Sequence, residues 1–269
     1  MSEFQYYWFE AIDRVLTPQQ QQELRDISSR AKITSRSFEN EYHFGDFKGK
    51  PIELMKKYFD AHIYYACWAT RVFMLKVPVK CIDLKLAKRY CTEHTFKIVE
   101  HGDDLIFCFK ISIEDGNGDW EEEEDAKQMI SLRDSIMAGD YRSLYLAWLA
   151  NRHDDHRRKN DDPPRPPVPA GLGKPTEPLK MFADFMFLED DDLEEAAKLS
   201  SDDVPKPQTL KEIKDWVTNL PDKDRQKILV DLLQEKTAAQ TIQRELKNRF
   251  IQDRKKADKP IKKPCRKKS

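Results

Sequence analysis

The stretch TFKIVEHGDDLIFCFKISI, residues 95–113, decides the fold class. It contains two runs rich in β-branched and aromatic residues, separated by a turn sequence near Gly102, which is the pattern of a β-hairpin. Successive residues of a strand point to opposite faces of the sheet, so apolar residues at every second position share one face. The second run has this alternation and predicts a strand packed on a core, with Leu105, Phe107, Phe109, Ile111 and Ile113 on the buried face.

Three segments outside the hairpin also have strand character. FQYYWFEAI (4–12) carries bulky residues on both faces, which favours an internal strand. SFENEYHF (37–44) alternates between aromatic and polar residues, as a half-buried strand does. RVFMLKV (71–77) is a short apolar run that ends at a proline. The N-terminal part of the chain is therefore predicted to contain a sheet.

Helix signals lie between and after these strands. In LTPQQQQELRDISSRA (16–31), Thr17 suits the N-cap, Pro18 the first helical position, and Gln20 completes a capping box. Gly139 fits the C-terminal cap of one helix, and the helix after it is predicted to present a single apolar stripe. Beyond residue 178 every periodic segment is helical. The fold class is therefore α+β: a mixed N-terminal domain with a β-hairpin, followed by an all-α region.

The stretch YFDAHIYYACWATR (58–71) places Asp60, His62 and Cys67 close together in sequence. We expect a helix here, because its apolar residues fall within one broad arc. Two steps of about 100° place Asp60 and His62 roughly 160° apart on a helix, so they do not converge on one ion or substrate. His62 is then a core residue and Asp60 an exposed partner of Lys56. Packing rather than a catalytic or metal site is the prediction.

The composition is that of a soluble, highly charged protein. Hydrophobic residues make up 39% of the 269 residues and charged residues 35%, with a mean hydropathy of −0.78. The first residues lack a basic segment followed by an apolar one, and no apolar run approaches the roughly 20 residues needed to span a bilayer. We therefore expect a cytoplasmic protein without membrane contact. The five cysteines form no C-x-x-C pair, which indicates reduced thiols rather than disulfides or zinc.

Composition shifts along the chain predict its domains. Residues 160–178 contain seven prolines and should be extended and stiff. Residues 244–269 carry twelve Lys and Arg and only three acidic residues, whereas the rest of the chain is acidic. The predicted division, from the N-terminus to the C-terminus, is an α+β domain at 1–158, a Pro-rich linker at 159–178, a helical region at 179–251 and a basic disordered tail at 252–269.

Several short motifs resemble ligand sites without completing one. EDGNGDWEEEED (114–125) starts like a calcium loop, but Trp120 and Ala126 stand where an EF-hand needs Gly and Glu. His153 and His156 could share a metal, yet no third ligand follows at a suitable spacing. GDFKGKP (45–51) enters a helix but lacks the spacing of a P-loop. We expect no metal, no cofactor and no catalytic residue from these motifs.

The chain resembles a family of uncharacterised bacterial proteins. That family begins with an AIDRPLT-like motif and continues with LYLGWLA-like, PPVPPGLG-like and W…LP motifs. The matching stretches here are AIDRVLT, LYLAWLA, PPVPAGLG and WVTNLP. The chain departs from the pattern at Val15 and Ala69, where Pro and Gly are expected, and the Lys-rich tail is not part of it. The resemblance implies a bacterial cytoplasmic protein and brings no established activity.

Three classes of function follow from these patterns. The leading hypothesis is a non-catalytic intracellular protein-interaction or regulatory protein whose protein partner is unknown. The first alternative is a nucleic-acid-associated factor that binds phosphate backbones without sequence preference through its tail. The second alternative is an enzyme with a site assembled from dispersed polar residues, namely Asp13, Arg14, His43 and Asp46. The candidate nucleic-acid-binding residues of the tail are Lys255, Lys256, Lys262, Lys263, Arg266, Lys267 and Lys268.

Overall fold

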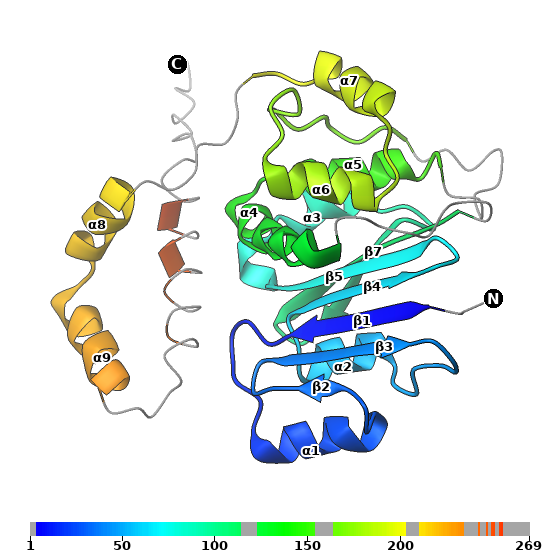
Figure 1. The fold of residues 1–269 in the computed structure, drawn as a ribbon. Helices are drawn as coiled ribbons and strands as arrows, with labels where there is room; N and C mark the ends of the chain where they lie inside the picture. The colour runs from blue at the N-terminus through cyan, green and yellow to red at the C-terminus, as the bar shows by residue number, and fades with distance from the viewer. Residues whose placement is uncertain are drawn as a thin grey trace, which may run out of the picture. The chain divides into compact units, whose positions relative to one another are not determined.

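An antiparallel sheet forms the centre of the N-terminal part (Figure 1). In the described part of the chain its seven strands have the order β2-β3-β1-β4-β5-β7-β6. β1 pairs with β3 on one side and β4 on the other, which confirms that it is internal. The strands are β1 Gln5–Glu10, β2 Lys32–Ile33, β3 Ser37–Tyr42, β4 Ala61–Ala66, β5 Thr70–Pro78, β6 Phe96–His101 and β7 Asp104–Ser112.

The computed structural model describes residues 4–113, 123–153, 164–202 and 210–233, and positions 242, 246, 249, 250, 253 and 254 near the C-terminus. The chain divides into two compact units, residues 1–207 and residues 208–269. The first unit contains the sheet and the helices that cover it, and the described helices of the second are α8 and α9. A strand-rich N-terminal part followed by helices confirms the predicted α+β class.

Helices pack on both faces of the sheet. On one face α1 and α2 bury Leu24 and Met55 against Phe9. On the other face Phe182 of α6 contacts Phe73 of β5, with ring centroids 6.0 Å apart. The helices are α1 Pro18–Ile27, α2 Pro51–Lys57, η1 Val79–Cys81, α3 Leu84–Ala87, η2 Lys88–Tyr90, η3 Glu123–Ser131, α4 Leu132–Ala138, α5 Arg142–Ala150, α6 Glu177–Phe185, α7 Asp190–Leu199, α8 Leu210–Asn219 and α9 Asp222–Leu233.

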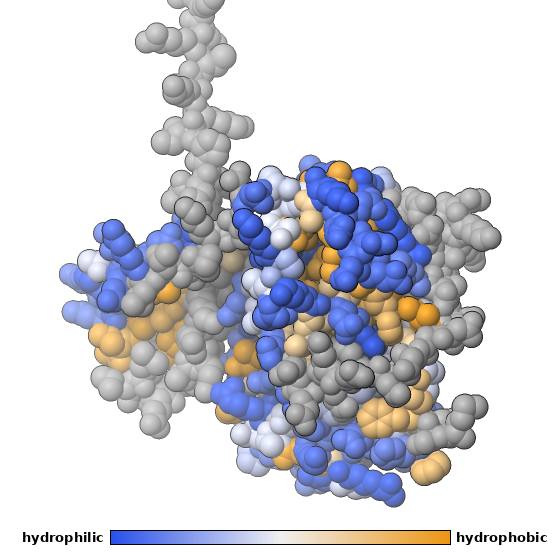
Figure 2. Space-filling model, turned by 45° about the horizontal axis from the view of Figure 1, so that its top comes forward, coloured by the Kyte–Doolittle hydropathy of each residue, from blue (hydrophilic) through white to orange (hydrophobic). Residues whose placement is uncertain are grey.

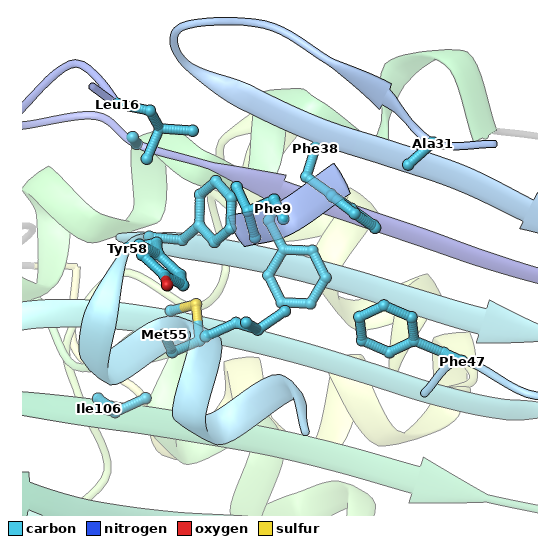
Figure 3. Packing of buried hydrophobic residues seen from close by; sticks show 12 residues of the cluster. Phe9, Leu16, Ala31, Phe38, Phe47, Met55, Tyr58 and Ile106 are labelled. Carbon is cyan, nitrogen blue, oxygen red and sulfur yellow. The ribbon is translucent and has the colours of Figure 1, made fainter. Parts of the chain in front are cut away.

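Aromatic rings fill the core between the sheet, α1 and α2 (Figure 3). Phe9 lies 5.8 Å from Phe38 and 5.2 Å from Phe59 between ring centroids. Phe47, from the loop before α2, packs 5.6 Å from Phe38. This ring needs a glycine beside it, because a Cβ on Gly49 would lie 2.5 Å from the Phe47 Cζ. The sequence FKG thus places an aromatic side chain over the sheet and leaves room for it.

Several local predictions are confirmed. The Thr17 side chain accepts a hydrogen bond from the amide of Gln20, and the Gln20 side chain accepts one from the amide of Thr17, so the capping box is present. β6 and β7 form the predicted hairpin, with Gly102 at a φ of 58° in the turn. Gly139 ends α4 in the left-handed conformation that a C-terminal cap favours.

The helix predicted over residues 58–71 is wrong. α2 ends at Lys57, and the stretch forms β4, a turn and the start of β5. β4 is buried on both faces, so its apolar residues follow no period of two and imitate a helical arc. Pairing with β1 and β5 decides the conformation, and those partners are distant in sequence. Asp60 is accordingly not an exposed partner of Lys56, which pairs with Glu53 instead.

The Pro-rich segment is part of the first unit and, over its described residues from 164 onward, packs against other elements of that unit. Tyr90 Oη donates to the Pro167 carbonyl, and Arg142 Nη1 donates to the Gly171 carbonyl. α6 and α7, which the sequence placed in a separate helical region, belong to the same compact unit as the sheet. α5 was predicted to bury a single apolar stripe, but all of its residues are buried.

Replacing Gly49 by alanine tests the packing of Phe47. We expect Gly49→Ala to lower the free energy of unfolding by about 1–3 kcal/mol, because the new methyl group would displace the Phe47 ring. Urea unfolding measures the change. Gly173→Ala is the matched control, since its Cβ would meet only the Ala197 Cβ at 3.8 Å. Equal stability of the two variants would contradict the packing argument.

Candidate functional site

Four buried charged side chains meet at the end of the sheet where β1 ends and β4 begins. Asp60 is 1% exposed, Lys76 and Arg133 are each 4% exposed, and Asp13 is 7% exposed. Asp13 follows β1, Asp60 precedes β4, Lys76 lies in β5 and Arg133 in α4. We call these four residues the buried charge network. It is the first candidate for a catalytic centre, because buried ionisable groups often mark one.

Each member of the network has its partner within the protein. Asp60 Oδ1 lies 2.9 Å from Lys76 Nζ, and Asp60 Oδ2 accepts from the amides of Ile12 and Asp13, both at 2.9 Å. Lys76 Nζ also donates to the Met55 carbonyl at 3.0 Å. The Arg133 guanidinium binds both carboxylate oxygens of Asp13, and its Nε donates to the Lys76 carbonyl at 2.6 Å.

Burial alone would raise the pKa of Asp60. The positive charges of Lys76 and Arg133 and the amide of Asp13 outweigh it and hold the pKa below its ordinary value. Asp60 is therefore a carboxylate acceptor at neutral pH, with no proton to donate. Its oxygens already accept from backbone amides and an ammonium group. The network ties four distant segments together and is a structural element rather than a reacting centre.

Asp60, which directly precedes β4, and His62 in β4 point to the same face of the sheet, because residues two apart in an extended segment point the same way. The sequence argument that they point apart is thus wrong, but its conclusion about His62 is confirmed: the side chain is 1% exposed. Its Nδ1 lies 2.9 Å from the Trp8 carbonyl, and its ring stacks on Phe9 at 4.0 Å. Burial lowers the pKa of His62 to about 3, so the ring is neutral.

The dispersed residues proposed for an enzyme site do not converge. Asp13 is committed to Arg133, and Arg14 donates from Nη2 to the Lys57 carbonyl. His43 and Asp46 are exposed and follow the last residue of β3, which is paired with the first residue of β1. Asp13 and Arg14 instead follow the last residue of β1. The two pairs of residues therefore lie at opposite ends of the sheet.

The metal-like motifs fall mostly outside the described residues. Residues 114–122 of the acidic loop and His156 lie outside the described residues. The seven basic tail residues predicted to bind nucleic acid also lie outside them. His153 is described, and its Nε2 lies 2.7 Å from Asp192 Oδ2 of α7. Over the part of the chain that the structure describes, no three His, Cys, Asp or Glu side chains are grouped closely enough to hold a metal ion.

Part of the sheet face that carries α2 is only partly buried. The register places Tyr7, Tyr64, Val72 and Lys110 in one row across β1, β4, β5 and β7. The next row ends with Met74, Cys108 and Lys97. None of these seven side chains is fully buried, and both lysines are exposed. We call this surface the open sheet face. Sequence alternation alone did not identify it, because it depends on where α2 stops.

The second unit has exposed apolar side chains of its own. Ile213 and Val217 of α8 are 38% and 43% exposed, and Leu229 and Val230 of α9 are 59% and 46% exposed. We call these four residues the α8–α9 apolar surface, and Figure 2 shows orange surface on these helices. Two other apolar residues of the unit are buried: Phe250, which packs on Trp216 at 5.3 Å, and Leu220, which is 6% exposed.

Comparison with known proteins gives no relative. No family model, no curated protein and no solved structure matches the chain. The described helices are all too short or too polar to cross a membrane. The arrangement of residues in this structure is therefore the basis for a functional proposal.

The buried charge network can be tested by removing one charge. We expect Asp60→Asn to lower the free energy of unfolding by about 3–5 kcal/mol, because the Lys76 ammonium stays buried without a counter-charge. Chemical denaturation measures this. The control Glu53→Gln removes the exposed pair with Lys56 and should leave stability nearly unchanged. A loss in Asp60→Asn no larger than in the control would refute the role of the network.

His62 should make stability depend on pH. Its pKa is about 3 in the folded protein and about 6.5 in an unfolded chain, so only the unfolded state binds a proton between these values. The stabilisation is present above pH 6.5 and is lost as pH falls. Between pH 7 and pH 5 the unfolding free energy should drop by about 2 kcal/mol more than in His62→Phe. Parallel stability curves for the two proteins would show that His62 is not held neutral by burial.

Proposed function

We propose that this protein is a non-catalytic intracellular interaction protein that binds a protein partner through the α8–α9 apolar surface. One observation carries the proposal: four aliphatic side chains on two successive helices are 38–59% exposed, while Leu220, Ile242 and Phe250 of the same unit are buried. Single exposed apolar residues are ordinary, but several on adjoining helices are typical of binding surfaces. The commitment of Asp13 and Asp60 to structural ion pairs is consistent with a role in binding.

An amphipathic helix is the partner that suits this surface best. Ile213 and Val217 are one helical turn apart, so they present a narrow apolar ridge along α8. Ridges of this kind pack against a helix with apolar residues at three- and four-residue spacing. Exposed charged residues on the same helix, Lys211, Lys214 and Asp215, can pair with charges at the rim of such a partner.

The test is a direct binding measurement with the full chain. Partners captured from native cytoplasm after nuclease treatment would be purified and titrated by calorimetry. We expect Val217→Asp combined with Leu229→Asp to weaken binding at least tenfold, because each charge would be buried on the apolar surface. Thr218→Asp is a matched control on an exposed polar position of α8 and should bind like the unaltered protein.

Two results would overturn the proposal. One is equal affinity of the double variant and the control for the purified partner. The other is a self-association that disappears in the double variant, measured by light scattering, because the surface would then join two copies of this chain. Circular dichroism of each variant establishes that the helices are intact.

A further inference from the structure

The open sheet face carries two neighbouring tyrosines. Tyr7 and Tyr64 are paired across β1 and β4, and their ring centroids lie 4.7 Å apart. Tyr7 Oη donates to Gln5 Oε1 at 3.0 Å, and Tyr64 Oη lies 3.5 Å from the same atom. These hydroxyl contacts hold both rings by their outer ends. The rings are therefore oriented in advance, and both keep part of their surface exposed to solvent.

Two lysines lie on the far side of the same surface. Lys110 ends the row that contains Tyr7 and Tyr64, two strands away from Tyr64, which is about 10 Å at the spacing of strands in a sheet. Lys97 ends the next row, beside Cys108. Both lysines are exposed, and neither forms an ion pair within the described ranges. Val72 and Met74 lie between the tyrosines and the lysines.

Among the described residues, an acidic group lies at the other edge of this surface. Asp46 lies beside Gln5, and its charge acts on the two tyrosines. The surface therefore has aromatic rings in the middle, positive charge towards β6 and β7, and negative charge beyond the tyrosines. An elongated ligand with flat rings on one side and anionic groups on the other matches this order.

We propose that the open sheet face binds single-stranded nucleic acid, with bases stacked on Tyr7 and Tyr64 and the phosphate backbone running along Lys110 and Lys97. An antiparallel sheet whose exposed aromatics stack bases is an established solution for single strands. Stacking tolerates any base, since every base has a π-face, and the lysines add sequence-independent attraction to phosphates. Duplex bases are stacked on each other and do not reach the rings, so single strands are preferred.

This site shares no residue with the basic tail or with the α8–α9 apolar surface. The tail lacks aromatic residues after Phe250, so it can contribute charge attraction but no stacking. If the preference for single-stranded over duplex nucleic acid is lost when Tyr64 is replaced, the binding is therefore due to the open sheet face and not to the tail. Failure of this proposal would leave the protein-binding surface untouched, because no residue is shared between the two.

The first test changes the ring. Binding of the full chain to a fluorescent 12-nucleotide oligothymidylate is measured by anisotropy, with a duplex of the same length as competitor. Tyr64→Ala should weaken binding about tenfold or more, whereas Tyr64→Phe, which keeps the ring and loses only the 3.5 Å hydroxyl contact, should retain most of the binding. Phe44→Ala removes an 84% exposed aromatic residue that is not part of the open sheet face and serves as the control. Thermal melting establishes that each variant is folded.

The second test changes the charge. Lys97→Glu combined with Lys110→Glu should weaken binding and reduce its dependence on salt concentration. Lys80→Glu combined with Lys85→Glu makes the same change of net charge at exposed positions outside the face and should have a smaller effect. Three results would overturn the proposal: no binding of the oligonucleotide, equal binding by Tyr64→Ala and Tyr64→Phe, or equal affinity for single strands and duplex.

Discussion

The two buried ion pairs, Asp60 with Lys76 and Asp13 with Arg133, are the constraint on which the first unit depends. Taking four charges out of water costs several kcal/mol for each ion, and only complete pairing offsets that cost. The pairs join the segment after β1, the start of β4, the last part of β5 and α4. Any register in which one partner is missing leaves an unpaired buried charge. The network therefore favours one arrangement of these elements over competing compact ones, beyond what apolar burial can do.

The N-terminal motif AIDRVLT has its physical explanation in this network. Ala11 is fully buried, Asp13 binds Arg133, and Arg14 donates to the last residue of α2. A motif made of charged residues thus stabilises the fold instead of carrying chemistry. Ala69, where the sequence resemblance led us to expect glycine, has a φ of +52°, in the left-handed region where glycine is favoured. The turn between β4 and β5 needs that conformation whichever residue stands there.

The predictions that succeeded rest on local signals. A capping box, a glycine at a helix end and a run with period two each report a conformation that neighbouring residues decide, as at Thr17, Gly139 and Phe107. The prediction for residues 58–71 failed because β4 is buried on both faces and its conformation is decided by β1 and β5. One feature of the sequence does indicate the buried charge network. Lys76 interrupts an otherwise apolar run, and a lysine in a buried strand requires a carboxylate nearby.

The buried ion pairs also distinguish residues that stabilise the fold from residues that can bind a ligand. Asp13, Asp60 and Lys76 have their hydrogen-bonding capacity occupied by the fold, and any ligand would have to compete with pairs that stabilise the sheet. Tyr64 and Lys110 lie on the same sheet outside this network, with Tyr64 half-buried and Lys110 exposed. Binding at such a surface uses a rigid platform that is already folded. In this protein, a binding site is therefore expected among partly exposed side chains of the sheet rather than among the buried charges.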